Sequence, residues 1–343
     1  MPNDLTTSGA PPLALHRYAI LCVGATLCLI FVGGLVTSTG SALAVPDWPL
    51  AFGHLIPKLE GGVRFEYGHR VAAGVVSLMT LGLALWIWRA ERRSWVRWLA
   101  LGAFGLVITQ AILGGITVLF QLPLLIAVTH AATAQAFFCV MVALAAVTNP
   151  QFGATSTDPS LAPPTGLTRL AALTTATIYL QILIGAVMRH LGAGLAIPDF
   201  PLSYGRLIPP LDSGFVMINF AHRCGAFIVA ILIATTTVRV LRSTPRDPWL
   251  TQPAWGLLAL LVLQITLGAL TIWSRRAVLP TTAHVATGAA VLATSLLLTI
   301  RLYASSTSLA RSETARLRES RPSMAGPGGG RVSEARPNNG ARA

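Results

Sequence analysis

The chain reads Leu43-Ala44-Val45-Pro46-Asp47-Trp48-Pro49-Leu50, and 152 residues later it reads Leu195-Ala196-Ile197-Pro198-Asp199-Phe200-Pro201-Leu202. The likeness continues at the same offset, where Phe52-Gly53-His54-Leu55-Ile56-Pro57 matches Tyr204-Gly205-Arg206-Leu207-Ile208-Pro209. Self-similarity at a nearly constant offset is the signature of an internal duplication. The sequence therefore predicts one structural unit that occurs twice in the same orientation.

The composition places this duplicated unit in a membrane. Of the 343 residues, 53% are hydrophobic and only 11% are charged, which excludes an ordinary soluble domain. A helix needs about 20 apolar residues to cross a bilayer. Eight segments meet this requirement, at residues 18–38, 68–88, 97–119, 124–146, 169–189, 219–240, 253–273 and 280–302. We predict an all-α integral membrane protein whose eight transmembrane helices form a tandem repeat of two four-helix bundles.

Proline, glycine and charge mark the boundaries of the two halves. The stretch 147–168 contains four prolines and separates the repeats, whereas the end of the chain is rich in Ser, Gly, Pro and Arg. Such compositions are typical of linkers and of disordered tails. The predicted parts are a cytoplasmic N-terminus over 1–17, an N-terminal four-helix bundle over 18–148, a linker over 149–168, a C-terminal four-helix bundle over 169–303 and a disordered basic cytoplasmic tail over 304–343.

The formal charge of +13 reflects orientation in the membrane. Arginines gather in the loop after the second segment, in the loop after the sixth segment and in the tail, all on one side of the bilayer. The positive-inside rule makes that side cytoplasmic, together with both termini. Five basic residues are on the opposite side and do not fit the positive-inside pattern: Lys58, Arg64, Arg206, Arg275 and Arg276. We interpret the basic residues as orientation signals and lipid-headgroup contacts, and we expect no nucleic-acid partner.

Four histidines occur at duplicated positions near the starts of apolar segments. They form two pairs with separations of 61 and 62 residues, His69 with His130 and His222 with His284. A polar imidazole is costly in a membrane, so repeated imidazoles there indicate ligands. Two nitrogens from facing helices suit the axial positions of a haem iron, whereas structural zinc prefers four protein ligands. Each half is therefore predicted to hold one haem toward the outer face, and the alternative for any single histidine is a hydrogen-bonded structural residue.

The residues beside the first histidine of each half suggest different roles for the two sites. Arg70 and Arg223 follow these histidines, and each is expected to contact either a haem propionate or the lipid headgroups. Glu66 precedes His69 by three positions, on the same side of a helix, whereas the second half has Asn219 in that place. A carboxylate at one site alone suggests chemistry there and electron transfer at the other. The alternative is a carboxylate that is favoured by the helix N-terminus.

The long outer loops, residues 39–66 and 190–218, contain proline-restricted backbone. Trp48 and Phe200 suit the membrane interface. We expect these loops either to form partial lids over their own halves or to be well-packed connectors.

Taken together, these residues resemble the haem A synthase family, whose eukaryotic members are mitochondrial assembly proteins for cytochrome oxidase. The resemblance covers about residues 15–303. It rests on Thr39-Gly40-Ser41, Pro46-Asp47-Trp48-Pro49, Glu66-x-x-His69-Arg70, His130, His222-Arg223 and His284. Some bacterial members have a cysteine pair in the first outer loop, and this chain has none there. A thiol role in that loop is therefore not carried over.

The resemblance implies an eight-helix enzyme that oxidises one porphyrin methyl of haem O to the formyl group of haem A, through successive hydroxylations and loss of water. It implies that His69 and His130 serve the substrate haem, and that His222 and His284 ligate haem b as the cofactor. Glu66 matches the essential carboxylate of the family.

We therefore expect a haem A synthase of a bacterial cytoplasmic membrane. Candidate partners are haem O synthase and oxidase assembly factors, besides the lipid bilayer and a second copy of the chain. One rival hypothesis is a di-haem cytochrome b that only transfers electrons. Another is a haem carrier or assembly module without enzymatic activity.

Overall fold

The computed structural model describes residues 12–152, 163–164 and 166–319, and this part of the chain is helical apart from its loops. Its long helices are α1 (Leu13–Ser38), α2 (Val63–Ala90), α3 (Ser94–Leu119), α4 (Leu124–Val147), α5 (Leu167–His190), α6 (Gly214–Ser243), α7 (Pro248–Trp273) and α8 (Val278–Glu319), and a 3-10 turn, η2 (Ala193–Leu195), follows α5. All eight are long and apolar enough to cross a membrane. The eight predicted spans are thus confirmed.

Prolines and a capping carboxylate set several helix starts. Pro12 and Pro123 directly precede α1 and α4, and Pro248 is the first residue of α7. Proline suits a helix start because the first helical N–H groups have no acceptor within the helix. Asp247 caps α7 by accepting a hydrogen bond from the Trp249 N–H at 2.9 Å.

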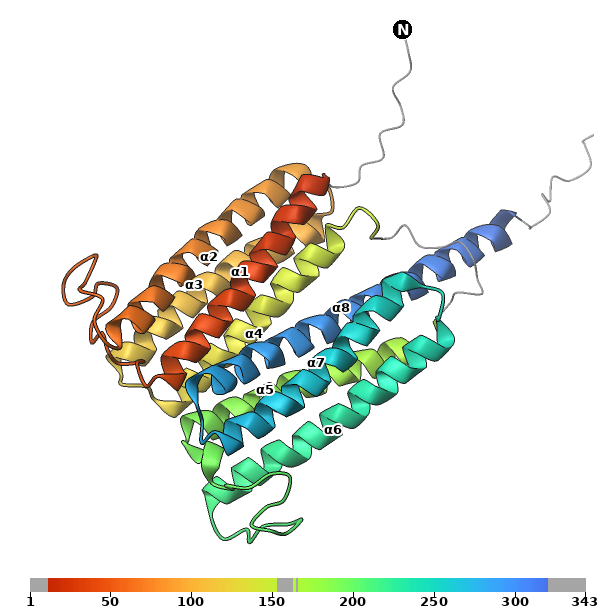
Figure 1. Ribbon diagram of the computed structural model, residues 1–343. Helices are drawn as coiled ribbons and strands as arrows, with labels where there is room; N and C mark the ends of the chain where they lie inside the picture. The colour runs from red at the N-terminus through yellow and green to blue at the C-terminus, as the bar shows by residue number, and fades with distance from the viewer. Residues whose placement is uncertain (1–11, 153–162, 165, 320–343) are drawn as a thin grey trace, which may run out of the picture.

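The helices of each half pack in a ring. In the first half α1 contacts α2 and α4, and α3 contacts the same two helices, so that α2 stands across the bundle from α4. The second half repeats this order, with α6 across from α8. The halves lie side by side, with α8 against α1 and α4 (Figure 1). Helices on opposite corners of each ring can therefore present side chains to a common interior.

Apolar side chains fill the inner faces and also cover the outside. Leu15, Ile87 and Met141 belong to the core of the first half, and Leu167, Ile233 and Leu257 belong to the core of the second. Phe138 and Ala289 form a third cluster between the halves. Leu78 is 70% exposed and Phe227 is 69% exposed. Such exposure on long apolar helices is expected where lipid is the solvent.

The two long loops lie at one end of the molecule, and the start of α1 and the end of α8 lie at the other (Figure 1). The loops share local structure, since Asp47 accepts hydrogen bonds from the Phe52 and Gly53 N–H groups while Asp199 accepts from Tyr204 and Gly205. These backbone N–H bonds, together with the charge of Arg70 or Arg223, hold the pKa of each carboxyl below its usual range. The duplicated sequence thus folds in the same way in both loops.

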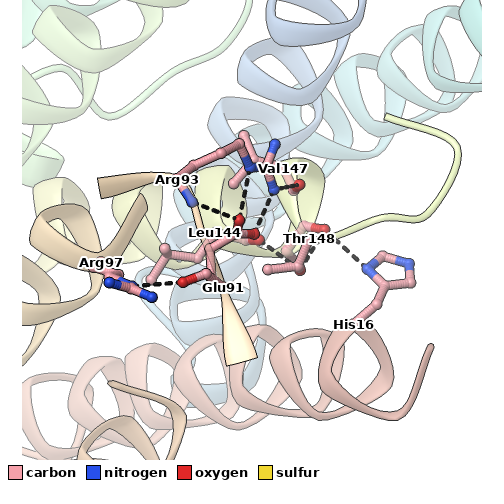
Figure 2. Close-up of polar contacts among 8 residues, drawn as sticks. His16, Glu91, Arg93, Arg97, Leu144, Val147 and Thr148 are labelled. Atoms are coloured by element: carbon pink, nitrogen blue, oxygen red, sulfur yellow. Dashed lines mark hydrogen bonds and ion pairs between the residues drawn. The ribbon is translucent and has the colours of Figure 1, made fainter. Parts of the chain in front are cut away.

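A polar cluster joins the helices at the opposite end (Figure 2). Glu91 forms an ion pair of 2.6 Å with Arg93, which also donates to the Val147 carbonyl at 2.8 Å. Nearby, His16 Nδ1 lies 2.9 Å from the Ala145 carbonyl. His16 is thus a hydrogen-bonded structural histidine.

One expectation about the tail is wrong in part. The sequence predicts disorder from residue 304, but α8 continues to Glu319. The segment 309–319 is rich in Leu, Ala, Arg and Glu, which are strong helix formers, and the Gly- and Pro-rich stretch begins only after it. Residues 320–343 lie outside the described residues.

Candidate functional site

The four repeated histidines lie at similar depths below the loop end. His69, His130 and His284 each come six residues after the first residue of their helix, and His222 comes eight residues after it. All four helices start at the end that carries the long loops. The rings therefore lie within about two helical turns of that end.

Each histidine ring occupies the space left by a glycine on the preceding helix. The pairs are Gly33 with His69, Gly114 with His130, Gly185 with His222 and Gly268 with His284. A β-carbon at each glycine would lie 3.0, 3.5, 2.9 and 3.1 Å, in that order, from Cε1 of the ring. The glycines let the rings lie deep between two helices. A side chain at residue 33, 185 or 268 would force the ring or the helix backbone to move.

The histidines of each half are near one another. His69 on α2 and His130 on α4 come from opposite corners of the first bundle and are close enough for their charges to interact. His222 on α6 and His284 on α8 have the same relationship in the second bundle. The fold thus brings together the two pairs that the spacing predicted.

The hydrogen bonds of the rings differ between the halves. Nδ1 of His69 and Nδ1 of His130 are buried and have no hydrogen-bond partner in the described part of the chain. In the second half, Nδ1 of His222 lies 2.9 Å from Nε2 of Gln181, and Nδ1 of His284 lies 3.1 Å from the Gln264 carbonyl. The Gln264 carbonyl can accept from Nδ1–H of His284, as the partner of a metal-ligating imidazole does, whereas the Gln181 amide nitrogen donates to Nδ1 of His222. Both contacts hold their rings in place, so the second site is the more preorganised.

The donor set fits an iron porphyrin better than a bare metal ion. No group of three or more His, Cys, Asp or Glu side chains suited to a metal ion occurs within the described ranges. A pair of imidazoles would leave four positions of an octahedral iron to other donors, and a porphyrin supplies four nitrogens.

Glu66 and Arg70 connect α2 to the first outer loop. One carboxylate oxygen of Glu66 accepts from the Val45 N–H at 2.8 Å, and the other pairs with Arg70 at 2.7 Å. The Arg70 guanidinium also donates to the carbonyls of Asp47, Leu50 and Val45 at 2.8, 2.9 and 3.3 Å. This carboxylate is buried and lies under the loop, about one helical turn outward from His69.

The second half builds the same junction without a carboxylate. Asn219 donates to the Ala193 carbonyl at 2.9 Å and accepts from Arg223 Nε at 3.0 Å. Arg223 donates to the Leu202 and Ile197 carbonyls at 2.8 and 3.0 Å. In both halves the arginine therefore ties the loop to the helix, a role that the sequence reading did not foresee.

The first loop also reaches across its bundle. A β-carbon at Gly115 on α3 would lie 2.7 Å from Cδ2 of Trp48, so the indole packs directly against the α3 backbone. The loop thus extends from the end of α1 over α3, which fits both a partial lid and a well-packed connector.

Several residues at the sites were missed by sequence reasoning. Gln181 and the four glycines were assigned no role there, although Gly33 and Gly185 are 152 residues apart, the offset of the repeated octapeptide. That offset was a usable signal for the glycines. Gln181 has Leu29 at the equivalent position, so the repeat gave no sign of it.

Comparison with known proteins identifies the family. Residues 16–296 match the COX15-CtaA family, described as "Cytochrome oxidase assembly protein". A protein of Symbiobacterium thermophilum named "Heme A synthase" is 34% identical over 75% of this chain and 85% of its own length. Proteins with the same name from Shouchella clausii and Geobacillus kaustophilus are 28% and 29% identical, over 67% and 73% of this chain and 78% and 80% of their own lengths. With its two histidine pairs and its helical architecture, the chain belongs to the COX15-CtaA family of cytochrome oxidase assembly proteins.

Proposed function

We propose that this protein is a haem A synthase, an oxidoreductase that converts haem O to haem A for cytochrome oxidase. The observation that carries the proposal is the unequal duplication of the site. Both halves present a histidine pair beside glycines, but only the first has a buried carboxylate, Glu66, next to it. Membership of the family and relatives named heme A synthase support this reading.

The two histidine pairs would hold different haems. His69 and His130 would bind the substrate haem O in the N-terminal half, and His222 and His284 would ligate haem b in the C-terminal half. The contacts of the second pair suit a resident cofactor, because they hold both rings before binding and because the Gln264 carbonyl can accept from Nδ1–H of His284, as a ligating imidazole requires. The unpartnered Nδ1 atoms of the first pair suit a ligand that enters and leaves. When bound, haem b supplies electron transfer.

Glu66 is the proposed catalytic residue. Its carboxylate lies between the loop and Arg70, so it can accept a proton or orient water at the outer edge of the substrate site. Asn219, at the matching position, cannot be a base. This difference favours a synthase over a di-haem cytochrome b, because electron transfer alone requires no carboxylate at one site.

The environment of the enzyme follows from charge and family. The arginine distribution supports a bacterial cytoplasmic membrane location with both termini cytoplasmic, which places the haem sites toward the outer face. Haem O synthase and oxidase assembly factors are the proposed partners, and a homo-oligomer is compatible with the exposed apolar helices. Propionate contacts through Arg70 and Arg223 would use N–H groups beyond those that hold the loops.

The deciding experiment is haem analysis of membranes from cells that make haem O, with the intact protein and with Glu66→Gln. Glutamine keeps an acceptor for the Val45 N–H, and the neutral Asn219 shows that this junction forms without a carboxylate. We expect haem A from the intact protein and about 100-fold or more slower conversion by the folded, haem b-loaded variant.

Two other outcomes would contradict these assignments. A haem-loaded intact protein that leaves haem O unchanged would favour the electron carrier or the haem carrier. Conversion by Glu66→Gln within a few-fold of the intact protein would leave Glu66 as a loop anchor only.

A further inference from the structure

Helix α5 presents a polar stripe to the second histidine pair. Gln181, Gly185 and Arg189 are spaced four residues apart and so lie on one face. Gln181 and Gly185 both contact the His222 ring. Arg189 is therefore one turn further out on the face that lines the C-terminal site.

The guanidinium of Arg189 is only partly satisfied. One terminal nitrogen donates to the Gly34 carbonyl at 2.9 Å and to the Ser38 hydroxyl at 2.8 Å, both on α1. Its Nε is buried and makes no hydrogen bond within the described residues. The ion pairs in that part of the chain join Glu66 to Arg70 and Glu91 to Arg93, so Arg189 has no carboxylate there.

A second cation adds to this local excess of positive charge. Arg276, in the turn before α8, is close enough to Arg189 for their charges to interact. Burying a guanidinium without a counter-ion is costly, and a like charge nearby increases that cost. The arrangement indicates that an anion from outside the chain belongs beside Arg189.

The location specifies what kind of anion this is. Arg189 is near enough to His284 for their charges to interact, and it lies about one turn outward from the glycine under His222. We propose that Arg189 binds a carboxylate of the haem held by His222 and His284, as a propionate-binding residue. This inference rests on the proposed function, because that function assigns the haem to these histidines.

The first half lacks this residue. At the repeat offset, Gln181 corresponds to Leu29, Gly185 to Gly33 and Arg189 to Thr37. The glycine that accommodates the ring is therefore kept, while the amide and the guanidinium are absent. This is the difference expected between a site that retains its haem and a site that releases its product.

The test uses the full-length protein with Arg189→Met and Arg189→Lys. Arg206→Met serves as the matched control, an exposed arginine in the second outer loop. The bis-histidine haem is monitored by its absorbance, its midpoint potential and its rate of transfer to an excess of an apo-haem acceptor protein.

We expect Arg189→Met to speed haem loss about tenfold or more, because charge-assisted hydrogen bonds are strong. The midpoint potential of the haem in Arg189→Met should fall, because the substitution removes a nearby positive charge that favours ferrous iron. Lysine should preserve most of the potential, and Arg206→Met should change neither quantity.

Reconstitution with the dimethyl ester of haem b separates carboxylate binding from general packing. The ester lacks the anionic groups, so it should bind the intact protein more weakly than haem b does and should make the intact protein and Arg189→Met nearly equal. A tenfold difference that persists with the ester would overturn the proposal, because Arg189 would then act through packing between the halves. Haem binding that survives His222→Ala and His284→Ala would instead refute the haem site itself, and the Arg189 proposal with it.

Discussion

The imidazole of His222 on α6 packs directly against Gly185 on α5, where a β-carbon at residue 185 would lie 2.9 Å from Cε1 of the ring. Gly33 and His69 repeat this relationship in the first half at 3.0 Å. Because close-packed interiors resist even one added methyl group, these glycines determine where the rings lie.

Alanine at the two glycines should therefore affect different sites. Gly185→Ala should displace His222, at a cost of about 1–3 kcal/mol, and lower the haem b content of the purified protein. Gly33→Ala should leave haem b bound but slow haem A formation, because it displaces His69. Haem extraction and the bis-histidine absorbance distinguish the two results.

Gly24→Ala is the control for both, since a β-carbon at Gly24 on α1 would meet nothing within 4 Å. Equal loss of haem b in Gly33→Ala and Gly185→Ala would contradict separate sites.

The contact between Trp48 and Gly115 predicts a compensating pair of mutations. Gly115→Ala should loosen the first outer loop by about 1–3 kcal/mol, because its methyl would overlap the indole. Trp48→Phe should restore much of this loss, since the second half has Phe200 and Ala269 at the equivalent positions. Hydrogen exchange of residues 45–54 measures the loop directly. If the two single effects simply add in the double variant, the residues do not interact as described.

The cluster at the opposite end should influence stability and leave the haem sites unchanged. Glu91 is buried and pairs with Arg93 (Figure 2). Glu91→Gln should lower the free energy of unfolding by about 1–3 kcal/mol and leave haem content unchanged, as followed by thermal unfolding in detergent. Arg92→Gln, at an exposed neighbour, should have little effect.

Burial acts to raise the pKa of Glu91, but hydrogen bonds from Arg93 lower it overall. The contribution of the pair should therefore be lost only as the pH falls through that lowered pKa.

Acid should open the outer loops through their aspartates. The N–H groups of Gly53 and Phe52 lower the pKa of Asp47, so its carboxylate stabilises the folded loop above the pKa of the unfolded chain, about 3.9. That contribution is lost as the pH falls through the lower folded-state value. Exchange protection of residues 45–54, corrected for intrinsic rates, should be constant from neutral pH to about pH 5 and decline below about pH 4.

Asp47→Asn should reduce this protection at neutral pH and flatten its acid dependence. Asp212→Asn, an exposed carboxylate of the other loop, serves as the control. An unchanged acid profile in Asp47→Asn would rule out Asp47 as the titrating group.

Part of the site was predictable because a membrane makes polar residues conspicuous. Imidazoles are rare in apolar segments, so His69, His130, His222 and His284 stood out, and the repeat offset showed which pairs to compare. Arg70 and Arg223 also stood out, but their contacts did not. Their acceptors are loop carbonyls, and every residue has a carbonyl, so only the folded loop selects which ones are used.

The sequence by itself determined the eight spans and the duplication, because crossing a bilayer requires about 20 apolar residues and because the octapeptide recurs after 152 residues. The end of α8 was misjudged, since helix-forming residues carry that helix on to Glu319. Only the tertiary structure decided that α2 faces α4 and α6 faces α8, and that glycines receive the four rings. It also decided that Arg189 of α5 donates to the Gly34 carbonyl and the Ser38 hydroxyl of α1, with no acidic partner among the described residues. These features depend on the packing of helices distant in sequence, and local pattern carries no information about which backbone lies opposite a side chain.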